Sequence, residues 1–248
     1  MRNVIAHLGT RLLISCAAAT AAIWPACALA AGLQIMPLRA TLTPSNLTAA
    51  FTLTNGTGAP VLMQLHAKRW TQDGGKDRLD DTDELLAAPP IFNMVQGATQ
   101  IIRVGSRHPV ADPGERTYRL IIAQVPTKVN NVRGVSFVTT LSLPIFVEPA
   151  TVLRGPSLEW TAKTVGRSEI SLRVENKGDE HAHIARLIIY GDIGRTQTLY
   201  ESTPGAYVLA GQWSSWRVNP TRPPAGSAVI IDAVLDTGAT LRAVASLR

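Results

Sequence analysis

The chain has 248 residues, a length that suits one large domain or two ordinary ones. Its composition, 46% hydrophobic and 17% charged with 16 prolines and 19 glycines, excludes a disordered, collagen-like or coiled-coil protein. The formal net charge of +6 is mild, no run of Lys or Arg exceeds two residues, and aromatic residues are few. The sequence therefore offers little support for a nucleic-acid-binding function.

Residues 1–30 have the pattern of a secretory signal peptide. Arg2 and Arg11 make a basic start without any acid, and an apolar run of about a dozen residues follows. The small residues Ala28 and Ala30 stand at alternate positions before the expected cut. We predict cleavage after Ala30 and export to an oxidising compartment.

Two other interpretations of this segment were weighed. An uncleaved membrane anchor needs roughly 20 apolar residues, and this run is shorter and is interrupted by Pro25. A lipoprotein attached through Cys16 is disfavoured because Arg11 leaves almost no apolar stretch before that cysteine. Cleavage removes both cysteines of the chain, so the mature protein must fold by core burial without a disulfide.

The rest of the chain alternates between short apolar runs and turn residues. No window longer than about ten residues keeps a helical period, so the pattern predicts an all-β sandwich or barrel. The expected strands are 32–42, 49–54, 61–70, 99–104, 117–124, 135–147, 157–163, 168–175, 182–190, 206–217, 227–235 and 239–246.

A boundary is expected at Pro149, where the longest alternating segment ends. It divides the mature chain into an N-terminal domain, 31–148, and a C-terminal domain, 149–248, each the size of an immunoglobulin-like sandwich. The polar stretch 72–84 is predicted to be a solvated loop. Its acids suggested calcium binding as an alternative, but their spacing matches no calcium loop.

The mature sequence lacks the recognised motifs of an enzyme. It contains no Gly-x-Ser-x-Gly elbow, Walker loop, His-Glu-x-x-His or cysteine nucleophile, so we expect no enzymatic activity, no cofactor and no ATP. His181 and His183 would share one face of a strand and so form half of a metal site, but an exposed polar face is the better interpretation. No metal is therefore predicted.

Segment 134–147 is unusual because it is a long strand pattern without any Lys or Arg. Pro144 cannot donate a backbone hydrogen bond, so the segment is predicted to be an edge strand or to contain a bulge. A long apolar edge is an aggregation hazard that proteins usually blunt with charge. Two interpretations remain open: an ordinary strand whose apolar face lies inside its own domain, or a strand whose first half is offered to another protein. The alternate side chains in question are Val135, Phe137, Thr139, Leu141, Leu143, Ile145 and Val147.

Six short segments of the first domain are individually weak but stand in one order and spacing: 51–55, 69–72, 89–92, 97–103, 118–126 and 145–149. On these segments the sequence resembles the PapD-like periplasmic pilus chaperones of the chaperone–usher pathway, in particular their archaic, spore-coat-U-associated branch. The second domain resembles them only through Glu175–Gly178 and its size.

The resemblance implies two immunoglobulin-like domains in a boomerang arrangement. It also implies that strand 134–147 completes the open groove of a pilus subunit by donor-strand complementation. Val135, Phe137, Thr139 and Leu141 would be the donated side chains, and those from Leu143 onward would belong to the chaperone's own core. The implied partners are pilus or spore-coat-U-like subunits and an outer-membrane usher, with no nucleic acid and no ATP.

The resemblance further implies a basic anchor for the subunit's C-terminal carboxylate. Arg39 matches one anchor position, whereas the second falls on Pro144, which carries no charge. Arg119 is the candidate replacement and Arg103 a third. A single cation would hold a carboxylate less firmly than a pair.

Two other functions were considered. An exported immunoglobulin-like pilin or adhesin subunit would usually have one incomplete domain and a donor extension after the signal. A secreted carbohydrate-active β-sandwich enzyme would need paired carboxylates among aromatic residues. Neither pattern is present in this sequence.

Overall fold

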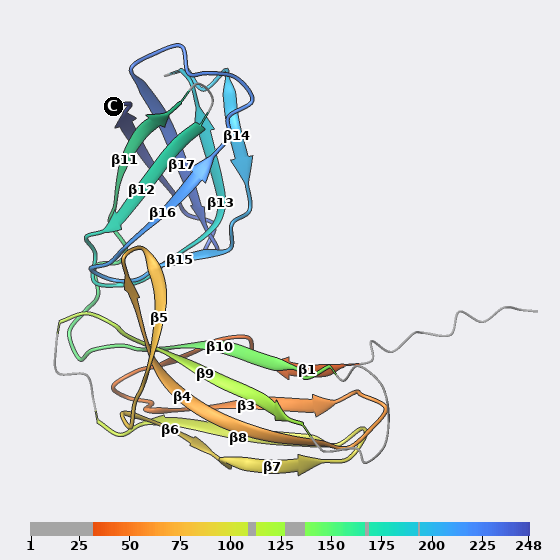
Figure 1. The fold of residues 1–248 in the computed structure, drawn as a ribbon. Coiled ribbons are helices and arrows are strands. Elements are labelled where there is room, and N and C mark those ends of the chain that lie inside the picture. Colours follow the sequence, from red (N-terminus) through yellow and green to blue (C-terminus); the bar gives the residue numbers. More distant parts are fainter. Residues whose placement is uncertain (1–31, 109–112, 127–136, 167–168, 193) are drawn as a thin grey trace, which may run out of the picture. The chain divides into compact units, whose positions relative to one another are not determined.

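The protein is described from a computed structural model, which covers residues 32–108, 113–126, 137–166, 169–192 and 194–248 (Figure 1). The predicted signal peptide and Val135 lie outside these ranges. The described ranges include no helix long and apolar enough to cross a membrane.

The described chain is built from strands. Their bounds are β1 Leu33–Met36, β2 Ala40–Leu42, β3 Thr48–Asn55, β4 Val61–Asp73, β5 Lys76–Asp81, β6 Leu85–Ala88, β7 Ile91–Met94, β8 Thr99–Ser106, β9 Arg116–Val125, β10 Thr140–Val147, β11 Leu158–Val165, β12 Glu169–Asn176, β13 Ala182–Tyr190, β14 Thr198–Ser202, β15 Ala206–Val208, β16 Trp213–Val218, β17 Ala228–Leu235 and β18 Thr240–Ser246.

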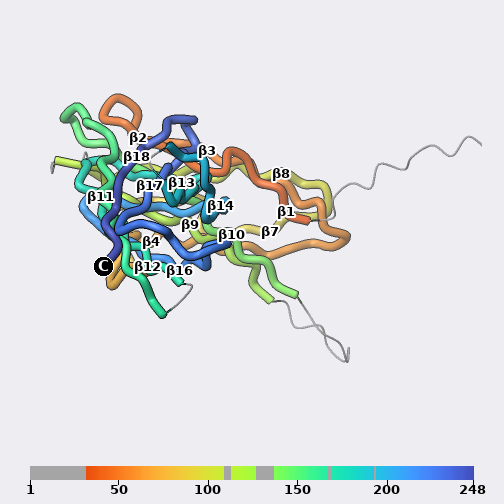
Figure 2. The backbone as a smooth tube through the Cα atoms, turned by 90° about the horizontal axis from the view of Figure 1, so that it is seen from above, coloured from red at the N-terminus to blue at the C-terminus, as the bar shows by residue number. Residues whose placement is uncertain are grey.

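The first sandwich consists of two sheets that enclose one apolar core. One sheet has the order β1-β3-β8-β6, and the other has the order β2-β10-β9-β4-β5 with β7 also paired to β4. β9 and β10 lie side by side in both backbone views (Figures 1 and 2). Alternate residues of each strand face the core, among them the fully buried Phe51, Leu120 and Ile145.

The second sandwich has its own core and shares no sheet with the first. Its sheets have the orders β11-β12-β16 and β14-β13-β17-β18, with β15 paired to β13. Leu172, Ile189 and Ile231 are among its fully buried residues. The chain therefore forms two immunoglobulin-like β-sandwiches, and the predicted all-β fold class is confirmed.

A buried asparagine ends the corresponding strand in each sandwich. Asn55 ends β3 and donates from Nδ2 to the carbonyl groups of Ala59, Met94 and Val95 at 3.0–3.1 Å. Asn176 ends β12 with the same alternation of burial and donates to the carbonyl groups of Glu180 and Val208. Each amide satisfies buried carbonyl groups at a turn, as a buried polar side chain must.

Stretch 72–84 is not the solvated loop that the sequence suggested. β4 continues to Asp73, turns at Gly74 and Gly75, and returns as β5, with Gln72 opposite Asp77. Both glycines have positive φ, 60° and 78°, which a two-residue hairpin turn requires. The polar composition concealed a strand because β5 lies at the edge of its sheet and buries little apolar surface.

Other boundaries also differ from the sequence-based prediction. Segment 32–42 forms two strands, β1 and β2, which belong to different sheets, and 206–217 is divided into β15 and β16. The strands β6, β7 and β14 were not predicted, because four or five residues carry too little periodicity to be recognised.

Candidate functional site

The first part of the candidate site is an open edge of β10. β9 pairs with all of β10, whereas β2 pairs in parallel only with Ile145–Val147. Among the described residues, no strand covers the second edge of 140–144. The first half of β10, residues 140–144, is thus an edge strand as predicted, and β2 covers the second half.

Hydrogen bonding shows which backbone groups point to this open edge. The Gln124 amide donates to the Thr139 carbonyl group at 2.9 Å, so odd-numbered residues of this segment turn their backbone groups toward β9. The backbone groups of Thr140 and Ser142 therefore point outward. The backbone nitrogen of Pro144 also faces the open edge. Because it would not bond to β9 in any case, its missing N–H leaves the pairing of β10 with β9 intact.

The side chains of β10 and of the residues just before it divide into a buried group and an exposed group. Leu143 and Ile145 are buried in the core of the first sandwich, which confirms the prediction for the residues from Leu143 onward. Leu141 is partly buried and packs against the same core. Thr139 is exposed, and Phe137 has 88% of its surface exposed. The interpretation that places Phe137 in its own core is therefore wrong.

The regular strand is shorter than the predicted segment 134–147. β10 begins at Thr140, and Phe137–Thr139 are not in a strand. The pairing of β10 with β9 ends at Thr140 and Ala123, and beyond it only the Gln124 amide still bonds to the Thr139 carbonyl group, so the regular ladder stops there.

The second part of the site lies where the two sandwiches meet around a small aromatic cluster. Trp70 and Phe146 come from the first sandwich, and Tyr207 and Leu209 come from the second. The Trp70 and Tyr207 rings meet edge to face with their centroids 5.2 Å apart. Trp70, Phe146 and Leu209 are almost completely buried, so this contact is dry.

The β4–β5 hairpin adds polar contacts to this interface. Gln72 donates from Nε2 to the Tyr207 carbonyl group at 2.8 Å and accepts from the Leu209 amide at 3.0 Å. At the turn, a Cβ atom on Gly75 would lie 2.5 Å from the Trp213 ring. The hairpin therefore packs closely against the second sandwich.

His181, just before β13, and His183, in β13, lie at this interface and not on an exposed polar face, so that interpretation is wrong. His181 stacks on Phe146 with ring centroids 3.7 Å apart, and its Nδ1 lies 2.8 Å from the buried Glu115 carboxylate. His183 stacks on Tyr207 at 4.1 Å. Tertiary packing covers both imidazoles, which strand periodicity alone could not reveal.

A basic pocket of about 350 Å³ lies beside the aromatic cluster and the β10 edge. It brings together two of the three predicted arginines, Arg39 and Arg119, with Pro144 between them in the lining. The second sandwich contributes His183, Tyr207 and Asp236. Among the described residues, this pocket is where the predicted anchor residues Arg39 and Arg119 lie next to the open edge of β10.

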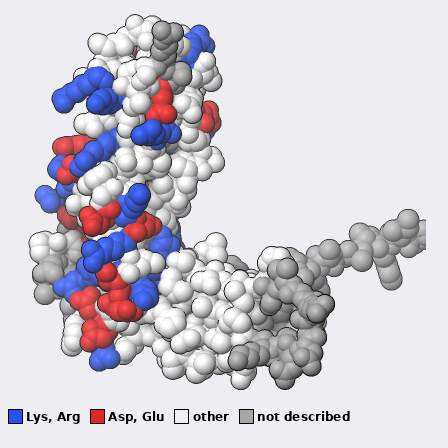
Figure 3. All heavy atoms as spheres, in the orientation of Figure 1, with Lys and Arg blue, Asp and Glu red and all other residues white. Residues whose placement is uncertain are grey.

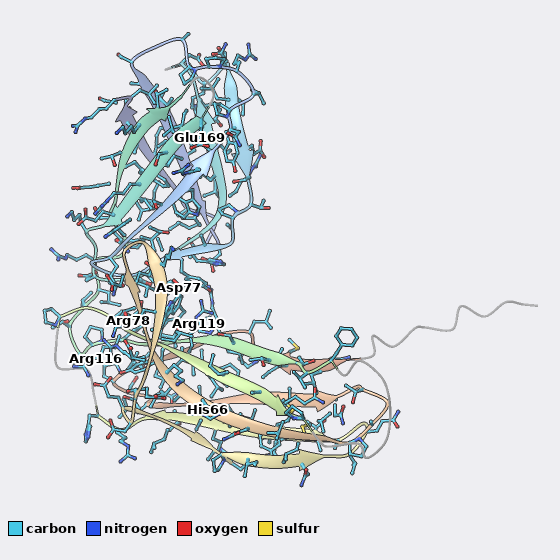
Figure 4. The ribbon with its side chains drawn as sticks, in the orientation of Figure 1. His66, Asp77, Arg78, Arg116, Arg119 and Glu169 are labelled. Atoms are coloured by element: carbon cyan, nitrogen blue, oxygen red, sulfur yellow. The ribbon has the colours of Figure 1, made fainter. Side chains whose placement is uncertain are left out.

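Arg119 is the arginine of the pocket that has no hydrogen bond or ion pair among the described residues. It projects from β9 near the base of the β4–β5 hairpin (Figure 4) and lies flat on Trp70, with 3.7 Å between Cζ and the ring centroid. Desolvation lowers its pKa. The nearby Arg69 and Arg116, by contrast, both bind Glu84. Arg119 is therefore a partly desolvated cation that is available to an anion.

Arg39 is already paired. Its guanidinium binds Asp236 in the turn after β17, and this contact is the main cause of its raised pKa. Asp236 also lies 3.2 Å from Nδ1 of His183. Arg39 therefore links the two sandwiches while it faces the pocket.

Arg103 lies elsewhere. It is exposed on β8, in the sheet opposite β9 and β10, and lines a separate shallow surface with Asn46 and Thr48. The structure does not bring Arg103 together with Arg39 and Arg119.

No group of three or more potential metal ligands is found in the part of the chain that the structure describes. His181 faces Glu115, and His183 faces Asp236. Each histidine therefore has a carboxylate partner of its own.

This geometry defines a class of protein: two immunoglobulin-like sandwiches in series, with an open strand edge on the first and a basic pocket lined by both. Residues 32–153 match the family model of the pili and flagellar-assembly chaperones, PapD N-terminal domain. Residues 32–153, which include the whole first sandwich, therefore belong to this family of chaperones. No curated protein sequence matches the chain.

Solved structures share the fold of the whole described chain. A chain of the CsuC–CsuE chaperone–tip adhesion subunit complex, from archaic chaperone–usher Csu pili of Acinetobacter baumannii, is 22% identical with a TM-score of 0.64 and covers 88% of this chain and 100% of its own. The E. coli chaperone DraB is 18% identical with a TM-score of 0.57, covering 88% and 97%. The Salmonella enterica SafA pilin–SafB chaperone complex matches at 16% identity and 0.57, covering 87% and 96%.

Sequence reasoning missed the residues that the second sandwich contributes to the site. Tyr207 and Asp236 lie more than 85 positions from Arg119 along the chain, and neither belongs to a recognisable motif. Trp70 and Gln72 lie in segment 69–72, which carried the family resemblance. The sequence therefore pointed to these two residues but assigned them no function.

Proposed function

We propose that this protein is a periplasmic chaperone that folds and caps pilus subunits and delivers them to an outer-membrane usher. It would do so by lending the β10 edge strand to a subunit that lacks one strand of its own. The observation that carries the proposal is the open apolar edge of β10, preceded by the exposed Phe137. The family membership of residues 32–153 supports the same function.

The edge has the chemistry needed to add a strand to another protein. Thr140 and Ser142 present unpaired backbone groups, which give affinity, while alternate side chains enter pockets and give specificity. Phe137 and Thr139 are free to enter a groove, and Leu141 is partly held by its own core. Val135 is the fourth proposed donor and lies outside the described residues. Each large apolar side chain that becomes fully buried contributes roughly 1.5–3 kcal/mol.

The surface around the edge suits an apolar partner. In the view of Figure 3, charged side chains gather over the second sandwich and the β4–β5 hairpin, and the rest of the first sandwich shows few. Three large apolar side chains close to the open edge are at least half exposed: Leu38, which lines the pocket with Pro144, and Phe137 and Val138, which precede β10. Exposed apolar side chains grouped in this way favour an interaction site.

Arg119 is the proposed main anchor for the carboxylate at the subunit's C-terminus, and Arg39, whose guanidinium already binds Asp236, is a second cation that adds positive charge to the pocket. Arg119 has no hydrogen bond or ion pair among the described residues, and in the β9–β10 ladder it is the residue opposite Pro144. A carboxylate that accepts charge-assisted hydrogen bonds there would fix the register of the subunit along β10. Arg103 lies on the opposite sheet, too far from β10 to share this role.

The solved structures support the class of partner. Two of the similar chains come from complexes described as a chaperone with a tip adhesion subunit and a pilin with its chaperone. The first of these belongs to an archaic system, which supports the assignment of this chain to the archaic branch.

Co-expression tests the proposal. Expressed in a bacterial periplasm with a candidate fimbrial subunit, the protein should yield a soluble one-to-one complex. Recovery of the subunit at equal yield without this protein would overturn the chaperone function.

Arg119→Glu tests the anchor within the same assay. It should weaken the complex at least about tenfold, because charge-assisted hydrogen bonds are worth about 1.5–3 kcal/mol. Arg103→Glu is the matched control, since it reverses a strand arginine on the opposite sheet, and it should have no effect. Equal effects of the two variants would refute the anchor.

A further inference from the structure

The basic pocket offers fewer free donors than its two arginines suggest. A carboxylate has two oxygens that can accept up to about four hydrogen bonds. Leu38 and Pro144 have no side-chain donor, and Asp236 is itself an anion that binds Arg39 and faces His183. Arg39 and His183 both face this carboxylate, so Arg119 and Tyr207 are the lining residues with a donor that Asp236 does not already engage.

The Tyr207 ring is held in place from several sides. It lies edge-on to Trp70 with centroids 5.2 Å apart and stacks on His183 at 4.1 Å. The Arg119 guanidinium lies 5.5 Å from its centroid. On the backbone side, Gln72 of the hairpin donates to the Tyr207 carbonyl group at 2.8 Å. The ring is therefore positioned before any ligand arrives.

The hydroxyl group is suited to donate a hydrogen bond into the pocket. Tyr207 lines the pocket beside Arg39 and Arg119, and no described residue forms a side-chain hydrogen bond with its hydroxyl group. A tyrosine hydroxyl both donates and accepts, so its proton is free for an anion. Desolvation raises the pKa of Tyr207, so the hydroxyl keeps its proton at neutral pH.

We propose that the Tyr207 hydroxyl is the second donor of the carboxylate site, so that the partner's terminal carboxylate is bound by Arg119 from the first sandwich and by Tyr207 from the second. This inference rests on the function proposed above. It assigns a recognition role to the second sandwich, which lies outside the strand that would be lent to the subunit. It also makes the site dependent on the interface that positions Tyr207.

Tyr207→Phe isolates the hydroxyl, because phenylalanine keeps the ring that packs on Trp70 and His183. The assay is calorimetric titration with two synthetic peptides of one alternating apolar sequence, one ending in a free carboxylate and the other in an amide. Tyr200→Phe is the matched control, since Tyr200 on β14 is also partly buried but packs against the core of the second sandwich. Thermal unfolding of each variant checks that the fold is retained.

The wild-type protein should bind the free acid at least about tenfold more tightly than the amide, because a carboxylate accepts charge-assisted hydrogen bonds. Tyr207→Phe should reduce this preference several-fold without changing affinity for the amide, and Tyr200→Phe should leave it intact. A preference that survives Tyr207→Phe in full would overturn the role of Tyr207 while leaving the Arg119 anchor in place. A wild-type protein that does not distinguish the peptides, or binds neither, would overturn the carboxylate anchor and this inference with it.

Discussion

Phe137 precedes β10 with 88% of its surface exposed, and Phe137→Asp replaces that apolar ring with a charge. Because the ring has little contact with the protein's own core, the free energy of unfolding should change by less than about 0.5 kcal/mol, as for most surface substitutions. The same ring would be buried in the subunit's groove. The substitution should therefore affect complex formation and leave the chaperone fold unchanged.

The expected loss of affinity follows from that burial. Fully burying a phenylalanine is worth roughly 1.5–3 kcal/mol, which corresponds to about 10- to 150-fold in the dissociation constant. Aspartate adds the cost of desolvating a carboxylate in an apolar groove, so the lower limit should be exceeded. Val152→Asp is the matched control, because Val152 is 92% exposed and lies after β10, away from the open edge.

The assay is the yield of the periplasmic complex and its dissociation constant, measured beside thermal unfolding of the free chaperone. Phe137→Asp should lose the complex at an unchanged unfolding temperature, and Val152→Asp should keep both. If Phe137→Asp retains wild-type affinity, Phe137 does not enter the groove and the donated segment has been placed wrongly. A large fall in unfolding temperature would refute the conclusion that the ring is outside its own core.

Two further predictions concern the interface and the second sandwich. Gly75→Ala should cost about 1–3 kcal/mol more than Gly74→Ala in urea unfolding: both glycines have positive φ, but only at Gly75 would the new Cβ lie 2.5 Å from the Trp213 ring. Equal costs would mean that the hairpin does not pack against Trp213. Asp232 is buried and accepts hydrogen bonds from Arg242 at 2.6 and 2.8 Å, which lower its pKa. This pair therefore stabilises the fold fully above about pH 4 and loses its contribution as the pH falls through the lowered pKa. Arg242→Ala should accordingly destabilise most at pH 7 and progressively less as the pH falls below about 4, and a cost independent of pH would contradict the assignment.

Much of the fold follows from local pattern. In β3 and β12, alternate residues are buried up to a terminal asparagine, and this period-2 signal is visible in the sequence. The prediction fails at the β4–β5 hairpin because an edge strand buries few apolar side chains and so resembles a loop in composition. It also fails at β6, β7 and β14, which are too short to establish a period.

The candidate site was only partly predictable. Arg39 and Arg119 were identified through resemblance, and the structure places both at one pocket beside Pro144. Arg103 stood in a matching segment as well, but its strand belongs to the other sheet. Sequence order cannot distinguish these cases, because it does not show which sheet of a sandwich a strand joins.

By itself, the sequence determined the all-β class, the family resemblance and the uncharged apolar segment before Val147, because alternation and composition are local properties. Only the tertiary structure decided that Phe137 is exposed while Leu143 is buried, since this depends on where the pairing of β10 with β9 stops and which residues pack over the core. Only the tertiary structure brought Tyr207 to Arg119, through contacts between residues distant in the chain. The physical reason is the same in both cases: burial and proximity are set by the partners that a strand acquires on folding.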